Sequence, residues 1–267
     1  MNSTSSFRRL QATGLAAATL LMADPAKSQP PYTLDVPYVP SPDQTVDTML
    51  RMGDVGPNDY LIDLGSGDGR IAIAAVQERK ARGALGVDID AERVAEARSN
   101  ARNAGVTGQV EFRQQDLFKT DFSQATVLTM YLLAEVNLKL RPVILDQLKP
   151  GTRVVSHAFD MGEWEPDASE EFDGRVVHAW IVPAKVAGRW QADGPAGPFA
   201  LTLAQSFQKI HGSAEIKGKT LPIGDATLTG DRLRFTLDGQ RYVGAVQGDR
   251  IAAVAGDGAA PDWHAQR

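Results

Sequence analysis

The sequence predicts an α/β fold built on a mostly parallel sheet, followed by a smaller antiparallel β-unit. A glycine-rich turn joins a short apolar run to a helical pattern within residues 60–76. Further apolar runs alternate with helical patterns up to about residue 183, as in the βαβ units of a parallel sheet. After Pro183 short alternating stretches follow, separated by turn residues, which is typical of antiparallel strands.

The glycine-rich turn is expected to be the centre of a ligand site. An apolar strand over residues 60–64 leads into Gly65, Gly67 and Gly69, and residues 71–76 begin a helix that is expected to run to about Arg82. The glycines permit a tight turn with no Cβ in the way of a ligand. We expect backbone N–H groups at the helix N-terminus to face that ligand, at the sheet edge where open α/β folds bind their ligands.

The glycine spacing and two nearby acids indicate which ligand binds. The third glycine comes one residue too early for the Gly-x-Gly-x-x-Gly turn that holds a pyrophosphate. Asp63 and Asp68 bracket the turn, and carboxylates there favour a cationic ligand over a phosphate. Gly-x-Gly-x-Gly after an Asp, with Ser66 between the first two glycines, resembles the S-adenosylmethionine (AdoMet) loop of class I methyltransferases.

Two later acids are expected at the same edge of the sheet. Asp88, with Ile89 beside it, ends the second apolar strand, where a carboxylate can accept both ribose hydroxyls. Capping of the next helix is its alternative role, but Asp90 fits that cap better. Asp116 follows the third strand and can accept from an adenine amino group, with Leu117 as an apolar wall.

The methyl acceptor is expected beside the ends of the fourth and fifth strands. The fourth strand, over residues 125–130, runs straight into Tyr131, and a helical stretch over residues 134–148, interrupted by Pro142, is expected to follow. Ser156 and His157 end the fifth strand, where they either orient the acceptor or cap the strand.

A proline-rich segment precedes the first helix. Ser41 is expected to cap that helix, with Gln44 completing a capping box and Gly53 ending it. Tyr38 belongs either to a plain linker or to a segment that folds over the cofactor as an aromatic lid.

Composition excludes several classes of protein. The chain of 267 residues has a net charge of −5 and a sequence pI of about 5.4, which argues against a general nucleic-acid binder. It has no cysteine, so thiolate metal sites and cysteine nucleophiles are excluded. The four histidines are scattered without paired spacing, and no metal site is expected.

The first 28 residues resemble a secretory signal. Arg8 and Arg9 precede an apolar run over residues 10–22 that is too short to span a bilayer, and small residues lead to a cleavage point after Ser28. A periplasmic or secreted protein is therefore expected, with membrane contact only through this signal. The alternative is a cytoplasmic protein translated from Met22.

Several ordered motifs within residues 34–185 are similar to those of the archaeal broad-specificity protein-lysine methyltransferases and their mitochondrial relatives. The resemblance implies a Rossmann-like, seven-stranded sheet with helices on both faces, AdoMet as cofactor and a protein lysine as acceptor. It also implies that residues 38–41 close over AdoMet; we expect Tyr131 and Tyr38 to line the acceptor channel. The motifs are Val36–Pro42, Asp63–Arg70, Ala125–Leu133, Val136–Asn137, Lys149–His157 and Trp164.

The resulting expectation is a methyltransferase domain over residues 29–185 and a small β-meander, or partial barrel, over residues 186–267. The sequence assigns no role to the β-unit and no oligomeric state. Two alternative functions stay open: a small-molecule methyltransferase, and an exported AdoMet-fold protein that binds a ligand without catalysis.

Overall fold

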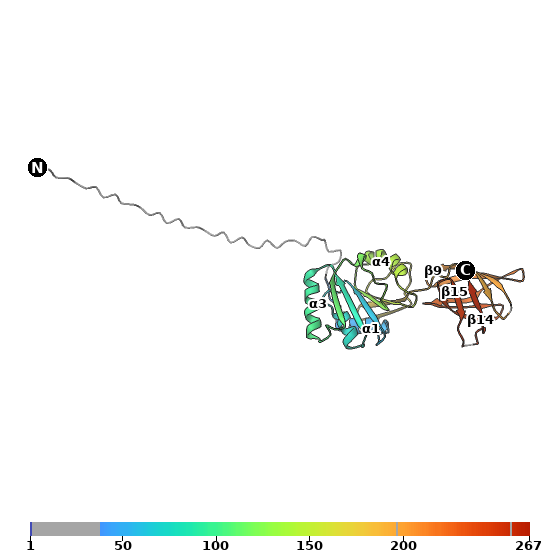
Figure 1. The fold of residues 1–267 in the computed structure, drawn as a ribbon, viewed down its shortest axis with the longest axis horizontal. Helices are drawn as coiled ribbons and strands as arrows, with labels where there is room; N and C mark the ends of the chain where they lie inside the picture. Colours follow the sequence, from blue (N-terminus) through green and yellow to red (C-terminus); the bar gives the residue numbers. More distant parts are fainter. Residues whose placement is uncertain (2–37, 196, 257) are drawn as a thin grey trace. The chain divides into compact units, whose positions relative to one another are not determined.

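The computed structural model describes residue 1 and residues 38–195, 197–256 and 258–267 (Figure 1). The expected signal therefore lies outside the described residues, apart from Met1. The described chain forms two sheets. The first ends at Ile181 and the second begins at Gly188, on either side of the expected boundary at residue 185.

The first sheet has seven strands in the order β3-β2-β1-β4-β5-β7-β6, which confirms the expected architecture. The pairings from β3 through to β5 are all parallel, while β7 runs antiparallel to both β5 and β6. Parallel strands covered on both faces explain why these segments read as continuous apolar runs. The strands are β1 (Tyr60–Leu64), β2 (Gly83–Asp88), β3 (Val110–Gln114), β4 (Val127–Met130), β5 (Arg153–His157), β6 (Ala168–Phe172) and β7 (Arg175–Ile181).

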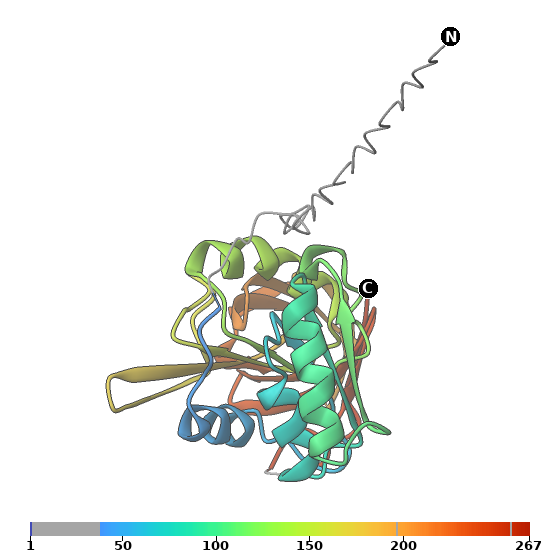
Figure 2. The ribbon, with the colours of Figure 1, turned by 90° about the vertical axis from the view of Figure 1, so that its left-hand side faces the viewer.

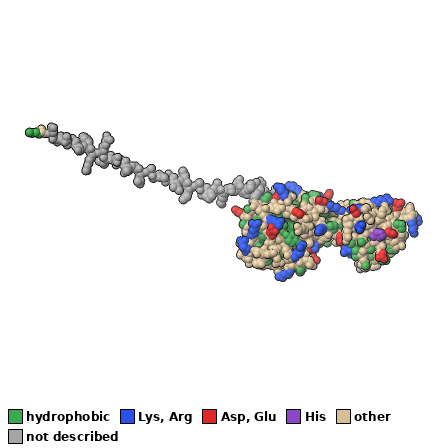
Figure 3. Space-filling view, in the orientation of Figure 1, with side chains coloured by type: hydrophobic (Ala, Val, Ile, Leu, Met, Phe, Trp, Pro, Cys, Tyr) green, Lys and Arg blue, Asp and Glu red, His purple; other side chains and the backbone are tan. Residues whose placement is uncertain are grey.

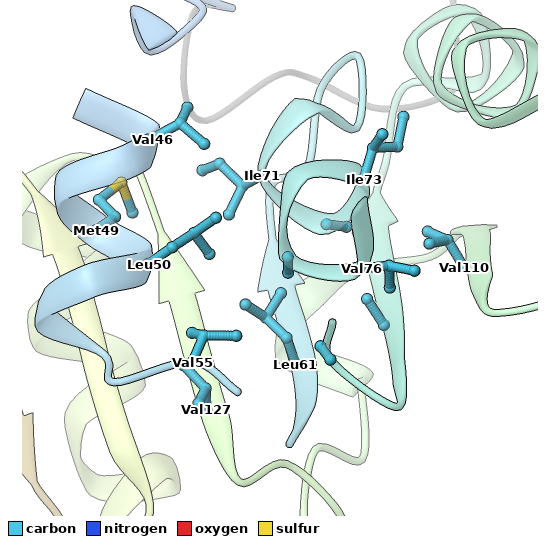
Figure 4. Packing of buried hydrophobic residues seen from close by; sticks show 14 of the residues in the cluster. Val46, Met49, Leu50, Val55, Leu61, Ile71, Ile73, Val76, Val110 and Val127 are labelled. Atoms are coloured by element: carbon cyan, nitrogen blue, oxygen red, sulfur yellow. The ribbon is translucent and has the colours of Figure 1, made fainter. Parts of the chain in front are cut away.

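Helices cover both faces of this sheet, as expected. Residues of α1, α2 and α3 share one buried cluster with one face of the sheet, and Figure 4 shows Leu50 of α1 and Ile71 of α2 above Leu61 of β1. Residues of α4 pack with the opposite face. None of the helices within the described residues is long and apolar enough to cross a membrane. The helices are α1 (Asp43–Met52), α2 (Arg70–Gln77), α3 (Ala91–Asn103) and α4 (Ala134–Gln147), with a 3₁₀ turn η1 (Leu117–Lys119).

Two helices differ from the sequence expectation. The helix α2 was expected to reach about Arg82 but ends at Gln77, and Lys80 then adopts a left-handed conformation with φ of 61°. That conformation breaks the helix, because L-residues in a right-handed helix keep negative φ. Pro142 was expected to interrupt α4, yet the helix continues through it.

The second sheet has nine strands in the order β11-β10-β9-β8-β16-β15-β14-β13-β12. The backbone N–H of Ile223, just before β12, donates to the carbonyl of Gly212 in β10 at 3.1 Å, so the sheet curls until its ends meet as a nearly closed barrel. Aromatic rings of Phe199, Phe235, Tyr242 and Trp263 fill the interior. The strands are β8 (Gly188–Asp193), β9 (Phe199–Ser206), β10 (Lys209–Ile216), β11 (Lys219–Pro222), β12 (Gly224–Thr229), β13 (Arg232–Leu237), β14 (Gln240–Gln247), β15 (Arg250–Ala253) and β16 (His264–Gln266).

Candidate active site

The topology of the first sheet fixes where a ligand binds. Strand β1 lies between β2 and β4, so the chain winds outward in one direction through β2 and β3 and in the other through β4 and β5. Ligands of open α/β sheets bind at the carboxyl ends of the strands where the winding reverses. The glycine turn and Tyr131 follow β1 and β4 at that point.

The glycine turn differs in one respect from its expected form. Gly65, Gly67 and Gly69 all have positive φ, between 52° and 83°, which explains the need for glycine. Their N–H groups are not a free ledge, however. Gly65 and Ser66 donate to the Val87 carbonyl, and Gly69 donates to the Ser66 carbonyl.

Two further amides of the turn are also occupied. Gly67 donates to Asp88, 2.9 Å away, and Arg70 donates to Asp68, 3.3 Å away. For these five amides the expectation of N–H groups facing the ligand was therefore wrong, because the turn uses them to hold its own shape. A loop with its donors occupied and carboxylates around it suits a cationic ligand better than a phosphate.

Asp63, in β1 just before this turn, is buried and has an unusual protonation equilibrium. Its Oδ1 accepts a hydrogen bond from Thr129 at 2.8 Å, and its Oδ2 is buried without a partner among the described residues. Burial raises the pKa of Asp63 to about 7, and the charges of Asp88 and Asp68 act in the same direction. A cation near this carboxyl would stabilise its charged form.

Asp88 has a structural function that the sequence did not predict. Its Oδ2 accepts from Gly67 N–H and its Oδ1 from Asp90 N–H, both at 2.9 Å. Asp90 in turn caps α3 by accepting from Glu92 N–H at 2.8 Å, as the sequence predicts. Asp88 is half-buried at the strand end, so its further lone pairs can still accept from a ribose.

Asp116 and the apolar residues near it lie at the expected strand ends. Asp116 caps η1 by accepting from Phe118 N–H at 2.9 Å, so it has a structural role in the turn. Leu117 and Ile89 are both half-buried. The hydroxyl of Ser66 is buried without a partner in the described chain, and it faces Gly86, where an added Cβ would lie 2.7 Å from it.

The segment before α1 lies against the glycine turn. A Cβ added at Gly67 would lie 2.5 Å from Cε2 of Tyr38, so that ring covers the turn directly. The guanidinium carbon of Arg93 lies 4.7 Å from the centre of the Tyr38 ring. Arg70 forms a salt bridge with Asp68 (2.6 Å) and donates through Nη1 to the Ser41 carbonyl (2.8 Å).

The sequence predicts that Ser41 caps α1, but in the structure it does not. The helix begins after Pro42 without a side-chain cap, and the Ser41 hydroxyl lies 3.0 Å from Nδ1 of His157 instead. The His157 ring lies 3.9 Å from the Tyr131 ring, centre to centre, with the planes tilted by 33°. Burial, and then the charge of Arg175, lower the pKa of His157 to about 4, so this imidazole is neutral at physiological pH.

Sequence reasoning missed the function of Asn137, which holds the turn after β5. Its Nδ2 donates to the Ser156 hydroxyl (3.1 Å) and to the Phe159 carbonyl (3.0 Å). Ser156 donates to the same carbonyl at 2.7 Å, so its hydroxyl is used within this turn rather than for an acceptor. The available signal in the sequence was the place of this polar residue, next to Val136 and three residues before Leu140, where an apolar side chain is expected; the structure buries it completely.

These features define an AdoMet-dependent methyltransferase. The described residues contain no group of three His, Asp or Glu side chains that could hold a metal ion. The occupied amides of the turn, the partnerless buried Oδ2 of Asp63 and the acids at the three strand ends fit the cationic AdoMet. Asp63, Asp88 and Asp116 are the acids in question.

Comparisons with known proteins agree with this class and identify the family. The model of the ANTKMT methyltransferase domain matches residues 63–168. A protein-lysine N-methyltransferase of Saccharolobus islandicus is 44% identical over 148 residues, which are 55% of this chain and 92% of that protein. The adenine nucleotide translocase lysine N-methyltransferase of Mus musculus is 34% identical over 157 residues, 58% of this chain and 68% of that protein.

A solved structure gives the same class. It is described as an RNA methyltransferase from Salinibacter ruber in complex with S-adenosyl-L-homocysteine, and it is 53% identical with a TM-score of 0.54. The match covers 55% of this chain and 96% of that one. The chain therefore belongs to the methyltransferase family of the Saccharolobus enzyme and the ANTKMT domain, and its cofactor is AdoMet.

Proposed function

We propose that this methyltransferase acts on the side-chain amine of protein lysines. The observation that supports the proposal most directly is the Tyr131 ring just after β4. The neutral His157 ring packs against it, with the ring centres 3.9 Å apart. The Saccharolobus and mouse relatives described above are both named as lysine methyltransferases, and their names support the same acceptor.

The chemistry requires an uncharged amine. When bound, AdoMet supplies a methyl group on a positively charged sulfonium. Lysine has an ordinary pKa of about 10.4, so its amine must lose a proton before it can attack. An aromatic wall of Tyr131, with Tyr38 on the opposite side, favours the neutral amine by desolvation and aligns it with the methyl group.

The proposed cofactor contacts follow from the geometry of the strand ends. Asp88 accepts from the ribose hydroxyls, and Asp116 accepts from the adenine amino group beside Ile89 and Leu117. Asp63 and the glycine turn, from Gly65 through Ser66 to Gly67, lie at the methionine end of AdoMet. Ser66 contributes by shaping the turn, because its hydroxyl faces Gly86 and its backbone N–H and carbonyl are bonded within the loop and to β2.

RNA is a second candidate acceptor, because the 53% identical structure is described as an RNA methyltransferase. The charge of this chain disfavours it. The net charge is −5, and in the face drawn in Figure 3 basic side chains are interspersed with acidic ones rather than gathered in one patch. RNA-binding surfaces normally carry a basic patch that neutralises phosphates.

The test is to follow the methyl group. The full chain is incubated with AdoMet carrying a labelled methyl group and, separately, with total protein and total RNA from cells that lack this enzyme. Acid hydrolysis of the protein fraction should release labelled Nε-methyllysine. Label in nucleosides alone would overturn the lysine proposal, and label in neither polymer would point to a small molecule.

We also propose that residues 1–28 direct export. The support is the Arg8-Arg9 pair, the apolar run over residues 10–22 and the small residues that end at Ser28. Cell fractionation followed by N-terminal sequencing should find a chain outside the cytoplasm that begins at Gln29. A cytoplasmic chain that begins at Met1 or Met22 would contradict export.

A further inference from the structure

Ser41 lies between the two halves of the active site and bonds to both. It is buried, with 4% of its surface exposed. Its carbonyl accepts from Arg70, which is held by Asp68 of the glycine turn. Its hydroxyl lies 3.0 Å from Nδ1 of His157, at the end of β5. One residue thus joins the cofactor loop to a strand end that is 116 positions away in the sequence.

His157 in turn packs against Tyr131. Its side chain is 4% exposed, and its ring packs on the Tyr131 ring with centres 3.9 Å apart. A ring held on one edge by a hydrogen bond and on one face by a neighbouring ring has little rotational freedom. The orientation of Tyr131 therefore depends on where the Ser41 hydroxyl lies.

The other end of the same segment is fixed to the cofactor loop. The Tyr38 ring lies on Gly67, and Arg93 packs on that ring at 4.7 Å from its centre. Tyr38 and Ser41 are three residues apart, so we expect displacement of the segment from the glycine turn at Tyr38 to disturb the Ser41 contacts as well.

We propose that Ser41 and His157 are positioning residues that couple the seating of residues 38–41 on the glycine turn to the orientation of Tyr131 beside the methyl acceptor. When the segment is seated, the Ser41 hydroxyl holds the imidazole against Tyr131. When it is displaced, a buried imidazole nitrogen loses its partner, which is unfavourable. The part of the proposal that concerns the acceptor rests on the proposed function.

The variants separate this coupling from plain stability. Ser41→Ala removes the hydroxyl but leaves the carbonyl that accepts from Arg70. Ser41→Thr keeps the hydroxyl and should restore the coupling. Thr45→Val is the matched control, because the Thr45 hydroxyl is also buried one turn further on, yet has no partner in the described part of the chain.

The first measurement is hydrogen exchange of the full chain by mass spectrometry, with and without S-adenosylhomocysteine, which needs no acceptor. In the wild type the ligand should slow exchange both at residues 63–70 and at residues 130–133 and 155–158. In Ser41→Ala the protection should persist at residues 63–70 and be lost at the two acceptor-side segments. Equal protection of those segments in Ser41→Ala and wild type would overturn the proposal, as would the same loss in Thr45→Val.

The second measurement is methyl transfer to the acceptor found in the labelling experiment. Ser41→Ala should lower kcat by about tenfold, equivalent to about 1.4 kcal/mol, while the Kd of AdoMet changes by less than about threefold. Ser41→Thr should recover most of kcat. A parallel loss of AdoMet affinity and kcat would overturn the coupling. If the hydrogen-exchange results are as expected but no lysine is methylated, the coupling through Ser41 and His157 is supported and the lysine acceptor is rejected.

Discussion

The ring of Phe207 in the second sheet stacks on the ring of Trp164 beside the first, with centres 6.1 Å apart and planes within 15° of parallel. Phe207 lies at the tip between β9 and β10 and has a positive φ of 55°, which is rare for a bulky residue. The guanidinium carbon of Arg141, on α4, lies 5.4 Å from the centre of the same ring. The tip of a β-hairpin thus joins the hydrophobic core of the methyltransferase sheet.

Replacing Phe207 with Ala is expected to destabilise the first sheet, although Phe207 belongs to the second. The change removes an aromatic stack and uncovers Trp164, so the free energy of unfolding should fall by about 2 kcal/mol. Urea unfolding followed by circular dichroism measures the loss. Lys217→Ala is the control, because Lys217 also has a positive φ, 49°, at the next hairpin tip but is exposed. Equal stability of the two variants would contradict the inference that this contact joins the sheets.

The contribution of Asp63 to stability without AdoMet is expected to fall as the pH rises toward neutrality, while the lowered pKa of His157 acts in the opposite direction between about pH 4 and 6.5. Burial raises the pKa of Asp63 from an ordinary 3.8 to about 7, so between these values the folded chain holds a proton that the unfolded chain has released. The contribution of this group to the free energy of unfolding therefore decreases by up to about 1.4 kcal/mol per pH unit and levels off above about pH 7. Urea midpoints over this range measure the slope.

Two substitutions in or beside β1 test that assignment. Asp63→Asn keeps the shape of the protonated acid but does not titrate, so the slope of stability against pH between about pH 5 and 7 should become more positive than in the wild type, by up to about 1.4 kcal/mol per pH unit. Asp59→Asn is the control: although burial opposes it, hydrogen bonds from Thr126 and Arg153 lower the pKa of Asp59. Asp59 therefore stabilises the fold above its ordinary pKa, and its loss should change stability on the acid side instead. An unchanged slope in Asp63→Asn would rule out Asp63 as its source.

Gly67→Ala is expected to weaken AdoMet binding because it displaces Tyr38. Position 67 has φ of +52°, and its new Cβ would lie 2.5 Å from the Tyr38 ring. Gly105→Ala gives a matched control, since φ there is +71° and nothing lies within 4 Å. Both should lose about 1–2 kcal/mol of stability through backbone strain, but calorimetry should find weaker AdoMet binding, by about tenfold, in Gly67→Ala alone. Equal AdoMet affinities of the two variants would mean that Tyr38 moves aside without affecting cofactor binding.

Asp88→Ala is expected to lower AdoMet affinity by one or two powers of ten, about 1.4 kcal/mol for each. The change removes a ribose acceptor and also the carboxylate that holds Gly67 N–H. Asp90→Ala is the control, because it removes a neighbouring acid that caps α3 and should cost about 1 kcal/mol of stability with little effect on binding. Calorimetric titration decides between the two, and similar losses of affinity would show that the effect comes from the loop as a whole.

Much of the fold was accessible from the sequence, because its signals are local. The apolar runs, the glycine turn and the acids at the strand ends sit in the order that a parallel sheet requires, and Asp90 caps α3 as predicted. Strand β6 was missed because Ala168–Phe172 is largely polar and lies at the edge of the sheet. Its available signal was the Asp173-Gly174 turn, both of whose residues have positive φ; Figure 2 shows this hairpin extending from the sheet.

The errors in the site have a common cause, which is that tertiary partners override local patterns. Ser41 has the sequence context of a helix cap, yet its hydroxyl forms a hydrogen bond with a histidine 116 residues away. The amides of the glycine turn were expected to be free to bind a ligand. Instead, the Val87 carbonyl and the Asp88 carboxylate of the neighbouring strand accept hydrogen bonds from them. A pattern of neighbouring residues contains no information about such partners.

The four tryptophans are buried to at least 99%, and they divide evenly between the two sheets. Trp164 and Trp180 belong to the core of the first sheet, and Trp190 and Trp263 to that of the second. Intrinsic fluorescence of the native chain should therefore come from indoles shielded from water, and opening of either core should shift its emission to the red. Replacing one pair with phenylalanine leaves a chain whose emission reports on the other sheet alone, so the order in which the two cores unfold can be observed optically.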